Sequence, residues 1–222
     1  LHSLDTRMDS IVGSDPLLQG LDIFSQKAFD MITSRRAREA FDISRESDSY
    51  RSLFGEDSFS QSCLLASRLI DAGVPFVTVS FGGWDTHQDN FNQLAGRLLP
   101  ALDQGLAAFF DRLRTRGLLE STTVMVTGEF GRTPKINKKA GRDHWARAMT
   151  ALLAGAGVQT ARVVGETNDK AEEPVGNGFS PDDLAATFYS AIGIDPAMEF
   201  DSNVGRPITL VRDGSPIGGL LN

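Results

Sequence analysis

Two apolar runs, each preceded by a helical pattern that ends at a glycine, constrain the fold of this chain more than any other feature. The first run covers residues 74–80 and follows a helical pattern over residues 57–72. The second covers residues 122–127 and follows a helical pattern over residues 94–116. Apolar runs without polar alternation are typical of strands buried on both faces of a parallel sheet. The order helix, strand, helix, strand therefore predicts an α/β protein with a mostly parallel sheet.

Local signals mark where the predicted helices begin and end. Gly73 ends the first helix, and Gly117 ends the second after three arginines in the last turn, which favour the negative pole of the helix dipole. Pro100 lies inside the second helical pattern and predicts a kink or a new helix start. A third helix is predicted to begin at Ser180, whose hydroxyl can cap it ahead of a proline and two acids.

The chain divides into a short N-terminal part and one larger domain. Apolar residues at helical spacing predict an amphipathic helix over residues 18–32. It falls in a helical segment, residues 1–55, that either belongs to the main domain or packs on it as an appendage. Residues 56–222 are predicted to form the α/β domain, since a chain of 222 residues can bury a substantial core. Further strands are predicted over residues 148–154 and, at a sheet edge, over residues 208–211.

The net charge and the hydropathy pattern argue against two classes of protein, although they do not exclude a local basic site. The net charge is −7 at pH 7, whereas general nucleic-acid binders carry an excess of cations. No apolar run approaches the roughly 20 residues that cross a bilayer as a helix. We therefore expect neither a nucleic-acid partner nor a membrane span. The single cysteine, Cys63, lies in an apolar helical stripe, which indicates a buried core side chain rather than a reactive thiol.

Carboxylate and imidazole side chains follow the two apolar runs, and this pattern indicates a metal site. The candidate ligands are Asp85, His87, Glu129, Asp143 and His144. Oxygen and imidazole ligands without sulfur suit a divalent ion such as zinc, manganese or magnesium. Because ligands bind beyond the carboxyl ends of parallel strands, we expect these residues to converge at one sheet edge. A shared ion requires the ring nitrogens and a carboxylate oxygen to lie within roughly 3–4 Å of one another.

A basic window surrounds the last two candidate ligands. Residues 132–147 contain six lysines and arginines and one acid, Asp143. A cationic loop beside a metal site attracts a phosphate or sulfate ester and stabilises the negative charge that builds on it. Arg132 is the predicted catalytic contact with that anion. The predicted partner is an anionic small molecule or polysaccharide that carries such an ester.

Each of these residues also has a purely structural interpretation. Asp85 could cap the following helix, and His87 could be a hydrogen-bonded loop histidine. Glu129 could form an ion pair with Arg132. His144 could pack against its neighbour Trp145, and the lysines could form a solvated face.

Three strings in these segments carry a family resemblance. They are Gly-Gly-Trp-Asp-Thr-His (82–87), Gly-Glu-Phe-Gly-Arg-Thr-Pro (128–134) and Gly-Arg-Asp-His-Trp (141–145). Together they resemble an uncharacterised bacterial family related to sulfatases, domain of unknown function 1501, of the alkaline phosphatase superfamily. The resemblance implies an α/β/α sandwich and two metal ions that serve the hydrolysis of phosphate or sulfate esters. It also implies an attacking Ser, Thr or modified Cys between the metals.

The resemblance assigns roles to individual residues and exposes two departures. Asp85, His87 and His144 match the ligands of one metal, and Glu129 stands where the superfamily has an aspartate for the other. Phe130 replaces the histidine that follows this aspartate, so the second site is weakened or absent. No segment matches the nucleophile. The resemblance thus implies that this chain begins after an N-terminal half with the first strand and the nucleophile, in a protein that is exported or periplasmic.

These observations predict a metal-dependent hydrolase-type domain that acts on a sulfate or phosphate ester. Glu129 or Asp143 would be an auxiliary ligand beside the three matched residues. Two alternatives stay open. The chain could be a non-catalytic relative that serves as a binding or scaffold domain, or a protein that binds an anion or polysaccharide without hydrolysing it.

Overall fold

The computed structural model describes residue 25, residues 35–176 and residues 178–222. Its α-helices are α3 (Arg35–Phe41), α4 (Asp48–Phe54), α5 (Ser58–Asp71), α6 (Asn90–Gln93), α7 (Leu99–Thr115) and α8 (Pro181–Ala191). Shorter helical turns are the 3-10 helices η1 (Ile43–Arg45) and η3 (Leu119–Ser121) and the π-helical turn η2 (Leu94–Leu98). Its strands are β1 (Thr123–Val126), β2 (Gly131–Arg132), β3 (His144–Trp145), β4 (Leu152–Gly155), β5 (Glu199–Asp201) and β6 (Pro207–Thr209). The helix predicted over residues 18–32 lies outside the described residues.

The predicted helix ends are confirmed. Asp57 caps α5 by accepting hydrogen bonds from the backbone N–H groups of Phe59 and Ser60. Gly73, with a φ of 89°, follows the last turn of α5 in the left-handed region that favours glycine. Ser180 and Asp183 form a capping box at the start of α8, because each side chain bonds the other's backbone N–H.

Pro100 explains why the long helical pattern is divided. Proline has no N–H to donate, so an α-helical bond to the carbonyl of Gly96 cannot form. The chain takes the wider π-helical turn η2 immediately before this point, and Pro100 lies in the first turn of α7. The helix therefore continues past Pro100 and changes its hydrogen-bond pattern there, so the predicted new start is not observed.

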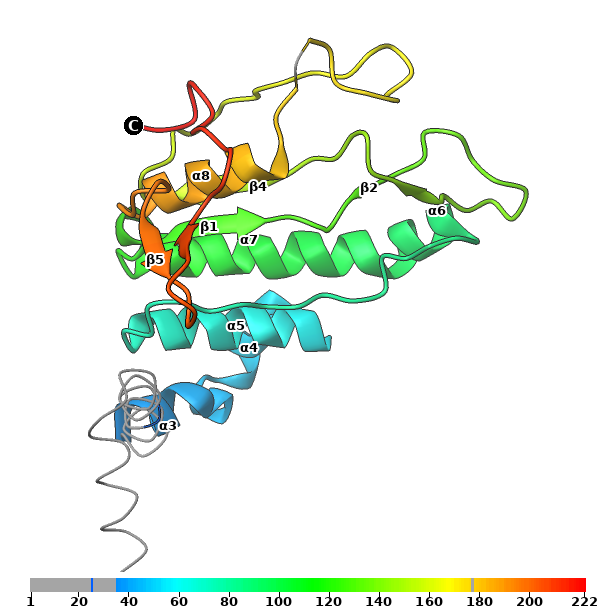
Figure 1. Cartoon of the computed structure of the whole chain (residues 1–222). Helices are drawn as coiled ribbons and strands as arrows, with labels where there is room; N and C mark the ends of the chain where they lie inside the picture. Colours follow the sequence, from blue (N-terminus) through cyan, green and yellow to red (C-terminus); the bar gives the residue numbers. More distant parts are fainter. Residues whose placement is uncertain (1–24, 26–34, 177) are drawn as a thin grey trace, which may run out of the picture.

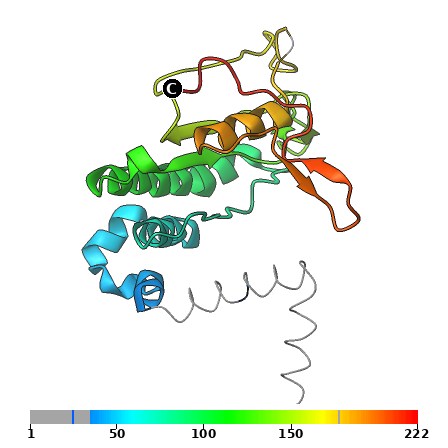
Figure 2. The ribbon, with the colours of Figure 1, turned by 60° about the vertical axis from the view of Figure 1, so that its left-hand side comes forward.

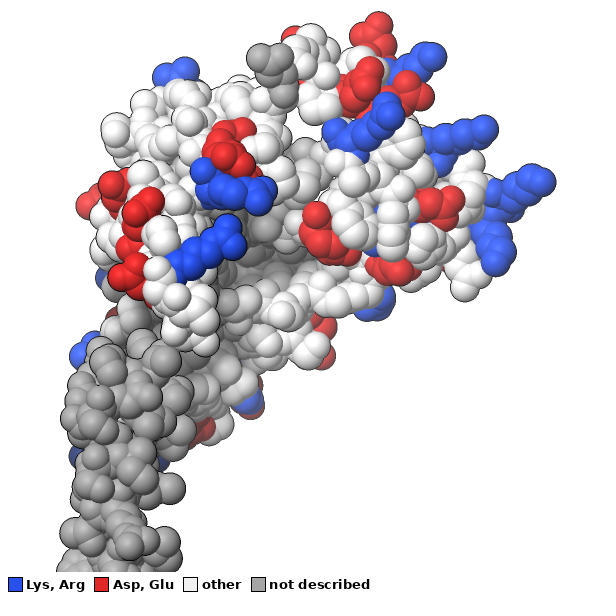
Figure 3. All heavy atoms as spheres, viewed as in Figure 1, with Lys and Arg blue, Asp and Glu red and all other residues white. Residues whose placement is uncertain are grey.

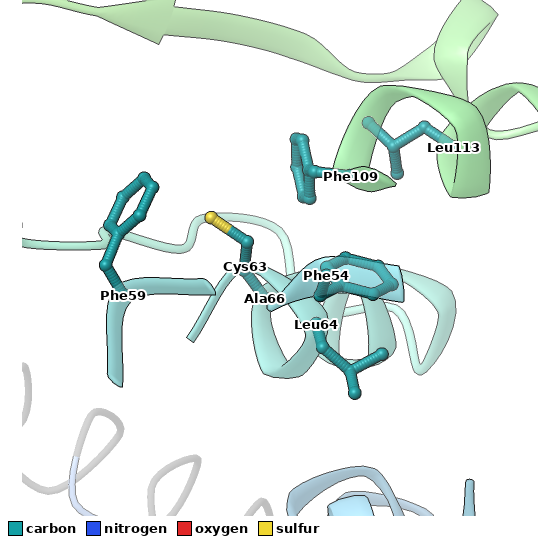
Figure 4. Close-up of a cluster of buried hydrophobic side chains, with 7 residues drawn as sticks. All are labelled: Phe54, Phe59, Cys63, Leu64, Ala66, Phe109 and Leu113. Atoms are coloured by element: carbon teal, nitrogen blue, oxygen red, sulfur yellow. The ribbon is translucent and has the colours of Figure 1, made fainter. Parts of the chain in front are cut away.

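The hydrophobic core lies between α4, α5 and α7. Figure 4 shows the buried cluster, which comprises Phe54, Phe59, Cys63, Leu64, Ala66, Phe109 and Leu113. Cys63 is only 3% exposed, which confirms its predicted place in the core. Burial raises the pKa of its thiol to about 12. Because Phe54 belongs to this cluster, residues just before position 55 contribute to the core of the main domain.

The three strand pairs are all antiparallel. β1 pairs with β4, β2 with β3, and β5 with β6. The strand predicted over residues 148–154 appears as β4, and the predicted edge strand over 208–211 appears as β6. The parallel arrangement is not found among the strands that the structure describes.

The first apolar run is extended but forms no strand. No backbone hydrogen bond joins residues 75–83 to another described residue. Val77, Val79 and Phe81 are half-buried against the helical core, whereas Thr78 and Ser80 between them are exposed, and Phe76 just before them is 68% exposed. The prediction of a strand buried on both faces was therefore wrong: one face of the segment meets the core, the other is exposed, and no described strand lies alongside.

The helices and strands form layers. Figures 1 and 2 show α7 between α5 on one side and the β1–β4 pair with α8 on the other. β2 and α6 lie together at one end of α7. The β5–β6 hairpin lies near the opposite end of α7. None of the described helices combines the length and apolar character needed to cross a membrane.

Candidate metal centre

The loop that carries Asp85 and His87 is anchored by aromatic packing and a buried polar pair. The ring of Phe81 stacks on Phe59 of α5 with centroids 4.2 Å apart, and Trp84 meets Phe81 edge-on at 5.4 Å. Thr86 is buried and donates a hydrogen bond to the side chain of Asn90, the first residue of α6. These contacts fix the loop at the start of the long helix.

A second loop, residues 133–142, is held against the first by backbone hydrogen bonds. The N–H of Arg142 donates to the carbonyl of Thr86 at 3.1 Å, and the N–H of Asn90 donates to Ala140 at 2.9 Å. Gly141 makes this approach possible, since a Cβ there would lie 1.9 Å from the carbonyl oxygen of His87. The two segments that carry the predicted ligands are therefore joined along their backbones.

The short β2–β3 ladder places the remaining site residues. Arg132 on β2 lies directly opposite His144 on β3 in the antiparallel register. Both side chains reach the first loop, because Arg132 and His144 each hydrogen-bond to Asp85. Arg132 and His144 thus meet Asp85 from neighbouring strands.

Asp85, His87 and His144 form a compact triangle of ligand atoms. Asp85 Oδ1 lies 3.0 Å from His87 Nε2 and 2.9 Å from His144 Nε2. The two Nε2 atoms lie 3.2 Å apart. These three residues meet the predicted criterion for a common ion, and they form the one such group found among the described residues.

The spacing and exposure of the triangle fit a divalent ion. Ligand atoms about 2.0–2.1 Å from a tetrahedral zinc ion are separated by about 3.3 Å, close to the three observed distances. The side chains of Asp85, His87 and His144 are 61%, 44% and 52% exposed. Catalytic sites commonly use three protein ligands and leave a position open, and this exposed face offers such a position.

Asp143 orients His87 rather than joining the triangle. Its Oδ1 accepts a hydrogen bond from His87 Nδ1 at 2.7 Å. A neutral imidazole that donates through Nδ1 keeps a lone pair on Nε2, the atom that faces Asp85 and His144. Asn137 supports the pair, because its Nδ2 donates to Asp143 Oδ1 at 3.1 Å and to the carbonyl of His87 at 2.9 Å.

Both aspartates are held in the ionised form by their partners. Hydrogen bonds from His144 and then Arg132 lower the pKa of Asp85 to about 2. Hydrogen bonds from His87 and then Asn137 lower the pKa of Asp143 below its ordinary value. Ionised carboxylates at neutral pH are the form that a metal ligand and a histidine-orienting group require.

Phe130 packs directly on the site. Its ring lies 4.5 Å from the ring of His144, measured between centroids, and the guanidinium of Arg132 lies over it at 5.8 Å. The side chain at this position therefore buttresses a candidate ligand and the candidate anion contact, and it supplies no ligand atom of its own.

Glu129 is not brought into the cluster. Its side chain is exposed and lies outside the group of candidate ligands. The alternative ion pair between Glu129 and Arg132 is also not observed among the described residues, because Arg132 pairs with Asp85.

In the basic window, residues 132–147, the arginines are paired within the protein and the lysines are exposed. Arg142 is committed to the loop, because its guanidinium donates to the carbonyls of Thr133 and Pro134 at 2.6 and 2.7 Å. Arg147 lies 3.5 Å from Glu173 in an exposed ion pair. The exposed lysines are Lys135, Lys138 and Lys139. Figure 3 shows basic side chains projecting from the end of the molecule where β2 and α6 lie in Figure 1.

Sequence reasoning missed Asn137 and Thr86. Asn137 organises the second loop, because its Oδ1 accepts hydrogen bonds from the N–H groups of Lys139 and Gly141. An asparagine in a polar loop is a signal for such turns, because its side chain readily hydrogen-bonds to backbone groups a few residues on. The spacing does not show that the same side chain also reaches His87 and Asp143.

Comparison with known proteins identifies the family and nothing narrower. Residues 1–221 match the family described as "Protein of unknown function (DUF1501)", and the chain belongs to that family. No curated protein and no solved structure matches the chain.

Proposed function

We propose that this member of the DUF1501 family is a metal-dependent hydrolase-type domain acting on a phosphate or sulfate ester. The observation that carries the proposal is the triangle of Asp85, His87 and His144, with edges of 2.9 to 3.2 Å. A divalent ion bound by these atoms would polarise an ester oxygen and favour an ionised nucleophile.

Arg132 supplies the anion contact in this proposal. Its guanidinium is planar and can donate two parallel hydrogen bonds to a phosphate or sulfate group. It lies beside Asp85 and over the ring of Phe130, so its position is restrained from two sides. The exposed lysines at positions 135, 138 and 139 add positive charge that attracts an anion to this end of the molecule.

The proposed function includes a relationship to the alkaline phosphatase superfamily and its α/β/α sandwich. Three strings of residues support it: 82–87, 128–134 and 141–145. Residues 75–83 also support it, because an extended segment with one face on the core is suited to a place in a larger sheet. We assign no nucleophile to this chain.

Metal binding and turnover by the purified protein test the proposal. The protein is stripped with a chelator, loaded with zinc or manganese, and analysed for bound metal after desalting. We expect one ion per chain in the unmodified protein and loss of that ion in Asp85→Ala and His144→Ala. Glu129→Ala is the matched control, since it removes an exposed carboxylate near the site but outside the triangle, and it should keep the ion.

An activity screen addresses the chemistry separately from metal binding. Aryl phosphates and aryl sulfates are offered to the metal-loaded protein, and Arg132→Gln is compared with the unmodified chain. Turnover that depends on metal and falls in Arg132→Gln supports the hydrolase proposal. Absence of a bound ion in the unmodified protein under zinc or manganese loading counts decisively against it.

A second candidate function is a non-catalytic domain with an incomplete site. Phe130 favours it, because an apolar ring occupies the position beside His144 where the resemblance implies a second metal's histidine. This candidate predicts stoichiometric metal binding without turnover of any aryl ester. The same two experiments therefore separate the candidates.

A further inference from the structure

A cavity rich in arginine lies far from the histidines. It has a volume of about 450 Å³ and is formed where α3, α5 and α7 end. The residues that line it are Arg36, Glu39, Ala40, Arg45, Glu46, Arg68, Asp71, Ala72, Arg112 and Arg116. From Asn90 to Arg112 the continuous helical run α6–η2–α7 rises about 33 Å, so the cavity and the histidines lie near opposite ends of that run (Figure 1).

The charge of this cavity is opposite to that of the whole chain. Five arginines face three acidic residues, which leaves a formal excess of two positive charges in a chain whose net charge is −7. The acids are already paired. Glu46 accepts from Arg68 at 2.5 Å and Arg112 at 3.1 Å, and Asp71 accepts from Arg116 at 2.5 Å. Glu39 likewise accepts from Arg45 at 3.1 Å and from Arg35, so the three acids engage only some of the N–H groups of the five arginines.

Two of the five arginines donate hydrogen bonds to carbonyl groups at helix ends. Arg36 donates to the carbonyl of Asp71 at the end of α5, and Arg68 donates to the carbonyl of Ala40 at the end of α3. These bonds offset the negative poles of helices that end here. Arg45, Arg112 and Arg116 make no such bond to a helix end, so they carry the capacity to bind a ligand.

Arg112 distinguishes this cavity from a network that only ties helices together. The residue is 7% exposed, and its Nε is buried without a hydrogen-bond partner among the described residues. Burying a positive charge costs free energy, and an oxyanion in the cavity would offset part of that cost by attraction to the guanidinium. The arginine fork suits tetrahedral oxyanions, and the volume lies within the range of small-molecule sites.

We propose that this cavity binds a phosphate-type oxyanion, either free or carried by a small phosphomonoester. This site is separate from the metal centre and does not depend on the proposed hydrolase activity. Its ligand contacts come from Arg112 at the wall and from Arg45 and Arg116 at the rim, where the side chains are 51% and 55% exposed.

Calorimetric titration of the metal-free protein at low ionic strength tests the proposal. Inorganic phosphate, inorganic sulfate and glycerol 3-phosphate are titrated separately, and chloride sets the background. Arg45→Gln combined with Arg116→Gln should weaken phosphate binding at least about tenfold, because each removes a charge-assisted donor. A stronger response to glycerol 3-phosphate than to phosphate identifies a carried group, and the reverse identifies the free ion.

Two further variants keep the result unambiguous. Arg162→Gln combined with Arg206→Gln removes the same charge from exposed positions outside the cavity and should leave binding within about twofold. The single variant Arg45→Gln gives a second reading if the double variant unfolds. No binding by the unmodified chain, or an equal loss in the exposed control, would overturn the proposal.

Discussion

The Nδ1 atom of His87 lies 2.7 Å from Oδ1 of Asp143, which turns the opposite ring nitrogen toward Asp85 and His144. Asp143 therefore acts on the candidate ion through His87. This relationship separates it from the three residues whose atoms form the triangle, although all four come from adjoining segments.

Asp143→Asn should weaken zinc binding by about 10- to 100-fold without changing the stoichiometry of one ion per chain. The amide cannot stabilise the His87 ring as a carboxylate does, but the three ligand atoms remain. Competition with a chromogenic chelator measures the affinity. Glu129→Gln is the control, and abolition of binding by Asp143→Asn would show that Asp143 is a ligand itself.

Gly141→Ala should destabilise the fold and weaken metal binding together. A Cβ at this position would lie 1.9 Å from the carbonyl oxygen of His87, so the two loops must separate. We expect a cost of about 1–3 kcal/mol in the free energy of unfolding, measured by urea denaturation. Gly96→Ala is the matched control, because a Cβ there meets nothing within 4 Å. Unchanged metal binding in Gly141→Ala would contradict the role of the loop contact.

The stability of the metal-free protein should depend on the ionisation of Asp85. Its pKa in the folded chain is about 2, below the ordinary value of 3.8. A lowered pKa means that the contribution of Asp85 is fully present above about pH 4 and is lost as the pH falls toward 2. The difference in unfolding midpoint between the unmodified chain and Asp85→Asn should shrink over that window. A carboxyl NMR titration with a midpoint near 4 would contradict the assignment.

Cys63 should resist thiol reagents at pH 8 in the folded protein. Its side chain is 3% exposed and burial raises its pKa to about 12, so little thiolate is present and access is blocked. Ellman's reagent should react with it only after denaturation. Cys63→Ser should lower the free energy of unfolding by about 1–3 kcal/mol, because a hydroxyl replaces an apolar-like group in the core. Rapid reaction of the native protein would show that the α5–α7 core opens readily.

Local features of the fold could be predicted because neighbouring residues determine them. Asp57 and Gly73 bound α5, Ser180 caps α8, and Pro100 marks the change from the π-helical turn to α7, each through residues a few positions away. Strand pairing could not be predicted in the same way. The run at residues 74–80 has the composition of a buried strand, but its environment depends on which distant segment lies beside it.

In the candidate site, too, residue types could be predicted from the sequence, whereas contacts between distant loops could not. Residue type and position after apolar runs singled out Asp85, His87 and His144, and the structure brings them together. The same signals also singled out Glu129, which remains exposed outside the group. The role of Asp143 depends on which atom of His87 it meets, and that depends on loop docking by Asn137 and Gly141. Sequence spacing carries no information about contacts between loops.

The extended segment over residues 75–83 has a practical consequence for handling the protein. Backbone donors and acceptors that no described neighbour engages form a template on which another polypeptide can add as a strand. Phe76, 68% exposed, adds an apolar side chain to that edge. At high concentration the chains are expected to self-associate first through this segment. A charged residue in place of Phe76 should reduce that self-association.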